Sequence, residues 1–154
     1  MKRKIFYLTS AGFKKIKREY QLFKKIKKAK LDQDVPSSFE SDAVNSDYLF
    51  FLEELGLLEK KIEKLEEVIK NAKVISAPED RKRKIVQIGA RIILESKRGI
   101  EKIRLVGTAE SDPFTGKISD ESPFGRALLG HKAGDIVLSP VSADEEFKIK
   151  KIAY

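Results

Sequence analysis

The chain has 154 residues, of which 41% are hydrophobic and 36% are charged, and its formal net charge is +8 at pH 7. It contains no cysteine, which excludes a disulfide framework and a thiolate metal site. No stretch reaches the roughly 20 apolar residues of a membrane span, and the N-terminal apolar run is too short for a signal peptide. We therefore expect a cytoplasmic protein without a membrane partner, whose basic character favours an anionic one.

The charges are segregated along the chain. Residues 1–30 contain twelve Lys or Arg against one acid, whereas residues 31–67 contain eleven Asp or Glu against three lysines, which gives +11 and then −8. A structural coiled coil does not need this segregation. It is typical of a helical hairpin that enters a charged environment, with a basic flank for phosphates and an acidic end for a cation or a basic surface.

A first helix is predicted to begin at Thr9. Thr9 is a favourable N-cap, and Leu8 and Phe13 have the spacing of a hydrophobic staple around it. Pro36 ends the helix at or before Val35. Between these ends, apolar residues recur at helical spacing, namely Phe13, Ile16, Tyr20 and Phe23.

A second helix is predicted from Asn45 to Ala72, after a polar connector over residues 36–44. Two helices with a short connector pair antiparallel and form an arm of roughly 40 Å; a dimerising coiled coil is the alternative. The seam of the second helix keeps a 3-4-3-4 spacing: Tyr48, Phe51, Leu55, Leu58, Ile62, Leu65, Ile69 and Ala72.

The C-terminal half has the alternation of strands. Residues 1–77 are predicted to form the coiled coil, with its tip near 35–44, and residues 78–154 a small antiparallel sheet domain, which makes the fold class α+β. The predicted elements of this domain are strands at 84–94, 100–106, 135–138 and 147–152, a hairpin turn at 96–99, a short helix at 125–129 and a turn at 142–145.

The sequence lacks the motifs that most enzyme classes need. There is no phosphate-binding loop or dinucleotide-binding glycine motif, and the only histidine, His131, lies in a glycine-flanked turn. We expect no cofactor of its own and no small-molecule substrate. Carboxylates gather around the connector, either as a solvated loop or as oxygen ligands for Mg²⁺ held elsewhere: Asp32, Asp34, Glu40, Asp42 and Asp47.

Three segments in order resemble the GreA/GreB family of bacterial transcript-cleavage factors. Residues 8–20 are similar to the family's opening, and Asn45-Ser46-Asp47-Tyr48 to its Asn-Ala-Glu-Tyr. The most specific match is Ile118-Ser119-Asp120-Glu121-Ser122-Pro123-Phe124-Gly125, followed by Ala127-Leu128 and Gly134-Asp135.

The resemblance implies a coiled coil that enters the secondary channel of bacterial RNA polymerase and an FKBP-like domain that binds the channel rim. In the family, two acids at the tip help the polymerase to hold its second Mg²⁺, so that the backtracked RNA 3′ end is cut by the polymerase itself. The chain is then no enzyme, holds no metal alone and at most stimulates this cleavage. The FKBP-like fold does not by itself imply prolyl isomerase activity.

Two groups of contact residues follow from the resemblance. The polymerase-binding candidates lie in the C-terminal motif: Asp120, Ser122, Pro123 and Phe124. The residues expected to guide RNA lie on the basic helix: Lys24, Lys25, Lys27 and Lys28.

The tip departs from the family. Alignment backward from Asn45 without a gap places Ser41 and Val44 where the family has its two acids, which leaves Asp42 first and Glu40 second as substitute catalytic carboxylates. Two functions stay open within the family: a cleavage factor with a rearranged acidic tip, and a non-cleaving paralogue that modulates or inhibits polymerase. A third, from another class, is a basic DNA- or RNA-binding module.

Overall fold

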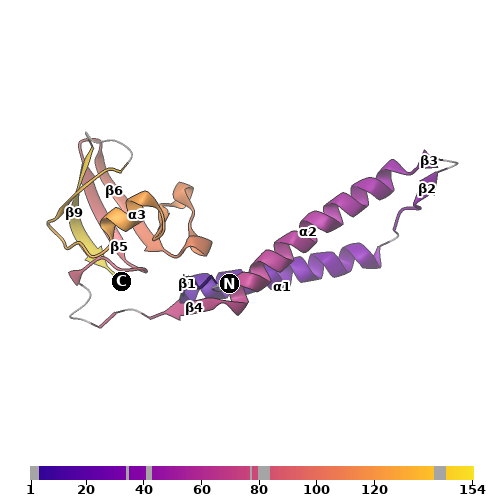
Figure 1. Cartoon of the computed structure of the whole chain (residues 1–154), viewed down its shortest axis with the longest axis horizontal. Helices are drawn as coiled ribbons and strands as arrows, with labels where there is room; N and C mark the ends of the chain where they lie inside the picture. Colours follow the sequence, from indigo (N-terminus) through magenta and orange to yellow (C-terminus); the bar gives the residue numbers. More distant parts are fainter. Residues whose placement is uncertain (1–3, 34, 41–42, 77, 80–83, 141–144) are drawn as a thin grey trace. The chain divides into compact units, whose positions relative to one another are not determined.

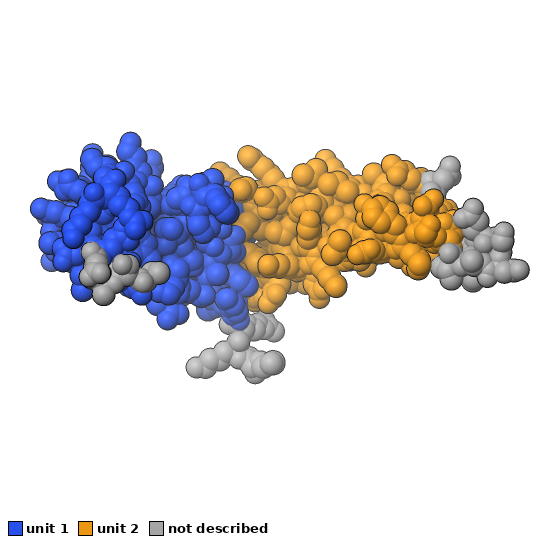
Figure 2. All heavy atoms as spheres, turned by 90° about the horizontal axis from the view of Figure 1, so that it is seen from above, with its two compact units in different colours: residues 1–13, 72–154 blue, residues 14–71 orange. Residues whose placement is uncertain are grey.

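The computed structural model describes residues 4–33, 35–40, 43–76, 78–79, 84–140 and 145–154, with the backbone alone at 39–40 and 43–44. The chain forms two compact units, one of residues 1–13 with 72–154 and one of residues 14–71 (Figure 2). Two long helices and a small sheet are present, so the predicted α+β class is confirmed. The predicted domain boundary between residues 77 and 78 stays a prediction.

Both long helices begin at side-chain caps. Thr9 precedes α1 (Ser10–Asp32), and its Oγ1 accepts a hydrogen bond of 3.0 Å from the backbone N–H of Gly12, as predicted. Asn45 caps α2 (Ser46–Lys70) by accepting from the N–H of Asp47. Because α2 ends at Lys70, it is slightly shorter than the apolar spacing predicts.

The two helices run antiparallel as a hairpin (Figure 1). Lys27 forms an ion pair of 2.7 Å with Glu59, and the ammonium of Lys61 lies 5.6 Å from the ring centre of Phe23. The later residue of α1 therefore contacts the earlier residue of α2, as antiparallel pairing requires. The predicted seam is buried or half-buried in α2: Tyr48, Phe51, Leu55, Leu58, Ile62, Leu65 and Ile69.

The connector contains a short β-hairpin where the sequence predicted only a polar loop. Strand β2 (Phe39–Glu40) pairs antiparallel with β3 (Ala43–Val44), in the register Phe39↔Val44 and Glu40↔Ala43. The backbone N–H of Asn45 also bonds the carbonyl of Ser38. These pairings bring the two sides of the connector together just before the N-cap of α2.

Two short parallel strands lie in the sequence just before the first long helix and just after the second. The sequence did not indicate them. Strand β1 (Phe6–Thr9) leads into α1, and β4 (Ala72–Ile75) follows α2; they pair from Phe6↔Ala72 to Thr9↔Ile75. Each strand has only four residues, too few for alternation to distinguish it from a helix end.

The main sheet has five strands in the order β7-β6-β5-β9-β8 and is mixed, because β6 and β7 run parallel. The hairpin of the two central strands turns at residues 97–98, as predicted. The elements are β5 (Arg91–Ser96), β6 (Gly99–Val106), β7 (Lys117–Ser119), β8 (Ile136–Leu138), β9 (Glu146–Ala153), helix α3 (Pro123–Leu128) and the 3-10 turns η2 (Thr108–Glu110) and η3 (Pro113–Thr115).

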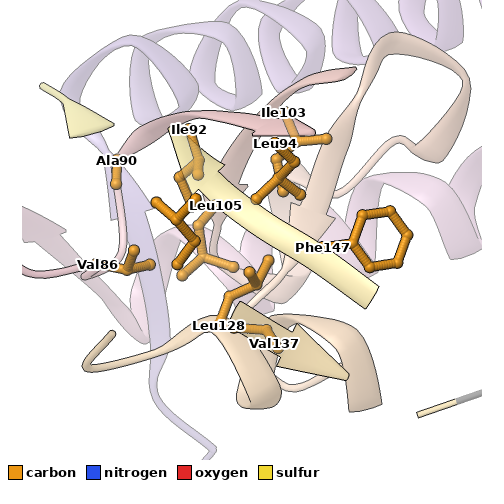
Figure 3. Close-up of a cluster of buried hydrophobic side chains, with 10 residues drawn as sticks. Val86, Ala90, Ile92, Leu94, Ile103, Leu105, Leu128, Val137 and Phe147 are labelled. Atoms are coloured by element: carbon orange, nitrogen blue, oxygen red, sulfur yellow. The ribbon is translucent and has the colours of Figure 1, made fainter. Parts of the chain in front are cut away.

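One face of this sheet is covered and forms the core of the domain. Side chains from the three central strands meet Leu128 of α3 and Val137 of β8 (Figure 3). Burial of large aliphatic side chains stabilises such a cluster by about 1.5–3 kcal/mol each. The fully buried residues include Ile92, Leu94, Leu105, Leu128 and Ile149.

The predicted strand at 84–94 is wrong in its first half, because only residues from Arg91 onward enter the sheet. The hydroxyl of Tyr154 donates to the carbonyl of Ile85 at 2.5 Å and accepts from the N–H of Gln87 at 3.0 Å. Gly89 has a φ of 97°, which turns the chain before the strand begins. The side chain of Tyr154 thus takes the place of strand pairing at Ile85 and Gln87.

Glu110 binds the start of α1. Its two carboxylate oxygens accept hydrogen bonds of 2.6 Å from the backbone N–H and from the Oγ1 of Thr9. A Cβ on Gly12 would lie 1.7 Å from a carboxylate oxygen of Glu110, and one on Gly107 would lie 1.7 Å from the carbonyl of Tyr7. These two glycines allow β1 and the start of α1 to approach the segment after β6.

We expect Thr9→Ala to lower the free energy of unfolding by about 1–2 kcal/mol, because it removes the helix cap, and with it one bond to Glu110. Urea unfolding followed by circular dichroism measures this change. The control is Ser10→Ala at the exposed next residue, expected within about 0.5 kcal/mol of wild type. Equal effects of the two substitutions would contradict the prediction.

Candidate functional site

The C-terminal motif forms a tight turn that leads into α3. Ser122 is the N-cap: its Oγ accepts from the N–H of Gly125 at 3.0 Å and donates to the carbonyl of Ser119 at 2.6 Å. Pro123 occupies the first helical position, where its missing N–H costs no hydrogen bond. The cap and the proline thus determine locally where this turn ends and the helix begins.

The last two residues of the motif pack inward. A Cβ on Gly125 would lie 1.9 Å from the carbonyl oxygen of Ser119, so only glycine fits. The ring of Phe124 lies 4.9 Å from that of Phe147, a core residue, at an interplanar angle of 56°. Phe124 is therefore half-buried and connects the turn to the core.

Asp120 is held in this turn at an energetic cost. Its backbone N–H bonds the carbonyl of Val106, but its Oδ1 is buried and has no hydrogen-bond partner in the described part of the chain. Burial, with the neighbouring charge of Glu121, raises the pKa of the Asp120 carboxyl above its ordinary value of 3.8. A buried acceptor without a donor is rare in folded proteins, which makes Asp120 the unusual residue of this turn.

The structure thus brings the four predicted polymerase contacts together within one turn but divides their tasks. Ser122 and Phe124 are used by the fold, as cap and as core contact. Pro123 is exposed, and Asp120 has an unused acceptor. Sequence reasoning missed Glu121, which is exposed beside Pro123 and forms an ion pair of 3.6 Å with Lys4.

The four predicted RNA-guiding lysines differ in their surroundings. Lys27 is engaged with Glu59 across the hairpin, and the ammonium of Lys24 lies 5.3 Å from the ring centre of Tyr20. Lys28 is exposed. Lys25 lines a hollow of about 370 Å³ on the outside of α1 together with Lys17, Arg18, Gln21 and Leu22.

The two substitute tip acids are not tested by the structure. Asp42 lies outside the described residues, and Glu40 is described by its backbone in β2, where it pairs with Ala43. Within the described part of the chain, no group of three or more histidine or acidic residues could hold a metal ion. His131 is half-buried in a turn, with its Nδ1 3.2 Å from Asp135.

Sequence comparison covers both halves of the chain. A family model described as "Transcription elongation factor, N-terminal" matches residues 6–74, and one described as "Transcription elongation factor, GreA/GreB, C-term" matches residues 81–154. The chain belongs to the GreA/GreB family of transcription elongation factors. The predicted resemblance is thereby confirmed.

Two relatives agree with this family in sequence. Transcription elongation factor GreA of Macrococcus caseolyticus is 35% identical over 152 residues, covering 96% of this chain and 95% of that protein. GreA of Thermoanaerobacter pseudethanolicus is 39% identical over 140 residues, covering 88% of each. The crystal structure of GreA factor homolog 1 of Thermus thermophilus is 26% identical, with coverage of 98% and 100% and a TM-score of 0.43.

None of the helices in the described residues has the length and apolar content to pass through a bilayer.

We expect Asp120→Asn to raise the thermal midpoint at pH 7. Because the pKa of Asp120 is raised by burial and by Glu121, its protonated form fits the fold better, and that stability is lost as pH rises through the raised pKa. Below the ordinary value of 3.8 the acid is neutral in both states, so the gain should vanish near pH 3.

Thermal unfolding at the two pH values measures the effect, with Asp32→Asn at an exposed position of α1 as the control. A gain that is the same at both pH values would contradict the role of the buried charge.

Proposed function

We propose that this elongation factor binds bacterial RNA polymerase through the turn at 119–125, inserts its coiled coil in the secondary channel and acts on paused or backtracked complexes in the cytoplasm. Family membership over residues 6–74 and 81–154 supports the proposal. The observation that carries the docking site is the buried Oδ1 of Asp120 without a partner in the described residues, next to exposed Pro123.

The coiled coil contributes a charged arm to this function. Lys25 and Lys28 extend from the outside of α1, where they are free to follow the phosphates of a backtracked RNA 3′ end. We assign Lys27 mainly to the hairpin, because Glu59 neutralises it. Lys24 lies close to the ring of Tyr20 but is exposed, so its ammonium remains able to contact RNA.

We propose that stimulation of cleavage is weak or absent. Ser41 and Val44 stand at the positions of the family's two acids, and neither offers an anionic ligand. The Mg²⁺ would belong to the polymerase and would activate water for phosphodiester hydrolysis. Glu40 and Asp42 have the oxygen donors that Mg²⁺ prefers, so they are the carboxylates of this chain suited to assist it.

We expect Pro123→Ala in the full-length chain to weaken binding to core bacterial RNA polymerase by about tenfold, equivalent to about 1.4 kcal/mol. Biolayer interferometry measures the affinity. Leu138→Ala removes another exposed apolar side chain of the same unit and should leave the affinity unchanged. Equal losses for both variants, or none for Pro123→Ala, would contradict the proposed docking turn.

For the tip, we expect Asp42→Ala to abolish whatever transcript cleavage the wild type stimulates, with polymerase binding intact. Ser41→Asp combined with Val44→Glu should raise cleavage, because it restores two anionic ligands near the metal. A stalled elongation complex with labelled RNA gives the measurement. Strong wild-type cleavage that survives replacement of both Asp42 and Glu40 by Ala would refute this assignment.

A further inference from the structure

The face of the five-stranded sheet opposite the core carries a concentration of positive charge that the proposed docking turn does not use. A hollow of about 420 Å³ lies over strands β5, β6 and β9 and the start of β7. Five cations line it, and none of the described residues that line it is acidic: Arg91, Lys102, Arg104, Lys117 and Lys151.

These cations are not neutralised by the rest of the described chain. None of the five forms an ion pair with a described residue. The Nε of Arg104 is buried and has no hydrogen-bond partner among the described residues. A buried donor without an acceptor costs about 1–3 kcal/mol in general, so the positive charge of Arg104 is kept in the fold at a cost.

Strand register places like charges directly opposite each other on this face. Arg104 pairs with Arg91 on one side and with Lys117 on the other. Like charges in such positions destabilise a sheet. Lys102 and Lys151 flank Ile93 in the same way, from β6 and from β9. The fold therefore maintains a block of positive charge against its own stability.

The positively charged surface extends beyond the first hollow and is larger than the binding site of a single anion. A second hollow, of about 390 Å³, shares Lys151 with the first and is lined also by Lys84, Lys132 and Lys150. Of these lysines, Lys150 forms an ion pair of 3.0 Å with Glu95. Neighbouring strands stand about 5 Å apart and alternate residues along a strand about 7 Å apart. Charges spread over several strands match a chain of phosphates better than one phosphate group.

An exposed aromatic ring stands beside this surface. Phe114 is fully exposed on η3, and the two residues after it, Thr115 and Gly116, line the first hollow. The turn is held by Asp112, whose carboxylate accepts from the N–H of Phe114 at 3.2 Å and from the Oγ1 of Thr115 at 3.0 Å. The backbone at Phe114 is thus held by Asp112, and its fully exposed ring is available to stack on a planar ligand.

We propose that the cationic sheet face with Phe114 binds single-stranded nucleic acid, with the phosphates along the hollows and a base stacked on Phe114. Cationic grooves with adjacent aromatic rings are the general means of binding single strands. A duplex would satisfy the charges but would keep its bases stacked within the helix and away from Phe114. The inference does not depend on polymerase binding, because free oligonucleotides test it.

The test measures fluorescence anisotropy of a labelled RNA of about 12 nucleotides with the full-length chain, over a series of KCl concentrations. Lys102→Gln with Lys151→Gln should weaken binding and reduce the slope of log K against log salt by about 0.7 for each lysine. Lys60→Gln with Lys64→Gln removes the same charge at exposed positions of α2 and should leave the slope unchanged.

Phe114→Ala should weaken single-strand binding by about tenfold, as expected for the loss of one stacked base, and should leave duplex binding unchanged. Ile100→Ala, at another exposed apolar residue of the sheet, is the matched control. DNA of the same sequence distinguishes the two nucleic acids, and either one bound through this face supports the proposal.

Three outcomes would overturn the inference. The first is full binding and an unchanged salt slope in the Lys102/Lys151 variant, with binding lost instead when Lys24, Lys25 and Lys28 become Gln, because α1 would then be the binding surface. The second is equal loss of duplex and single-strand binding with Phe114→Ala. The third is a polyglutamate peptide that competes as well as the oligonucleotide, which would assign the face to an acidic protein.

Discussion

The carboxylate of Glu110 joins two parts of the chain that lie 101 residues apart in sequence. It accepts two hydrogen bonds of 2.6 Å from Thr9, the residue that also caps α1 through Gly12. Hydrogen bonds to an ionised acceptor are stronger than neutral ones, and a negative charge suits a helix N-terminus. The start of the long helix is therefore fixed to the turn after β6, and β1 and β4 can pair beside it.

The cations of this protein fall into two classes that sequence alone does not separate. On the coiled coil, Lys27 and Lys30 meet Glu59 and Glu54 across the hairpin. Exposed ion pairs of this kind contribute little to the free energy of folding, about 0–1 kcal/mol each. Their main effect is to favour the antiparallel register of the two helices. On the sheet, Arg104 and its neighbours meet each other instead, and their charge remains available to a ligand.

The C-terminal turn shows how a binding surface can be held at the expense of stability. Ser122, Gly125 and Phe124 each have a local reason in the fold, through a cap, a close approach and a core contact. Asp120, in contrast, is held at a cost to the fold, because burial raises its pKa and leaves one oxygen without a donor in the described chain. A partner that rearranges the turn and supplies a donor to this oxygen would remove that cost.

Sequence by itself determined the long helices, the seam, the cap at Thr9 and the family, because these depend on spacing and on residues close along the chain. It also predicted the contact motif at 120–124. Only the tertiary structure decided the β1–β4 pair, the turn held by Tyr154 in place of a strand, and the block of cations on the sheet. These depend on register and on contacts between distant residues, which local patterns do not encode.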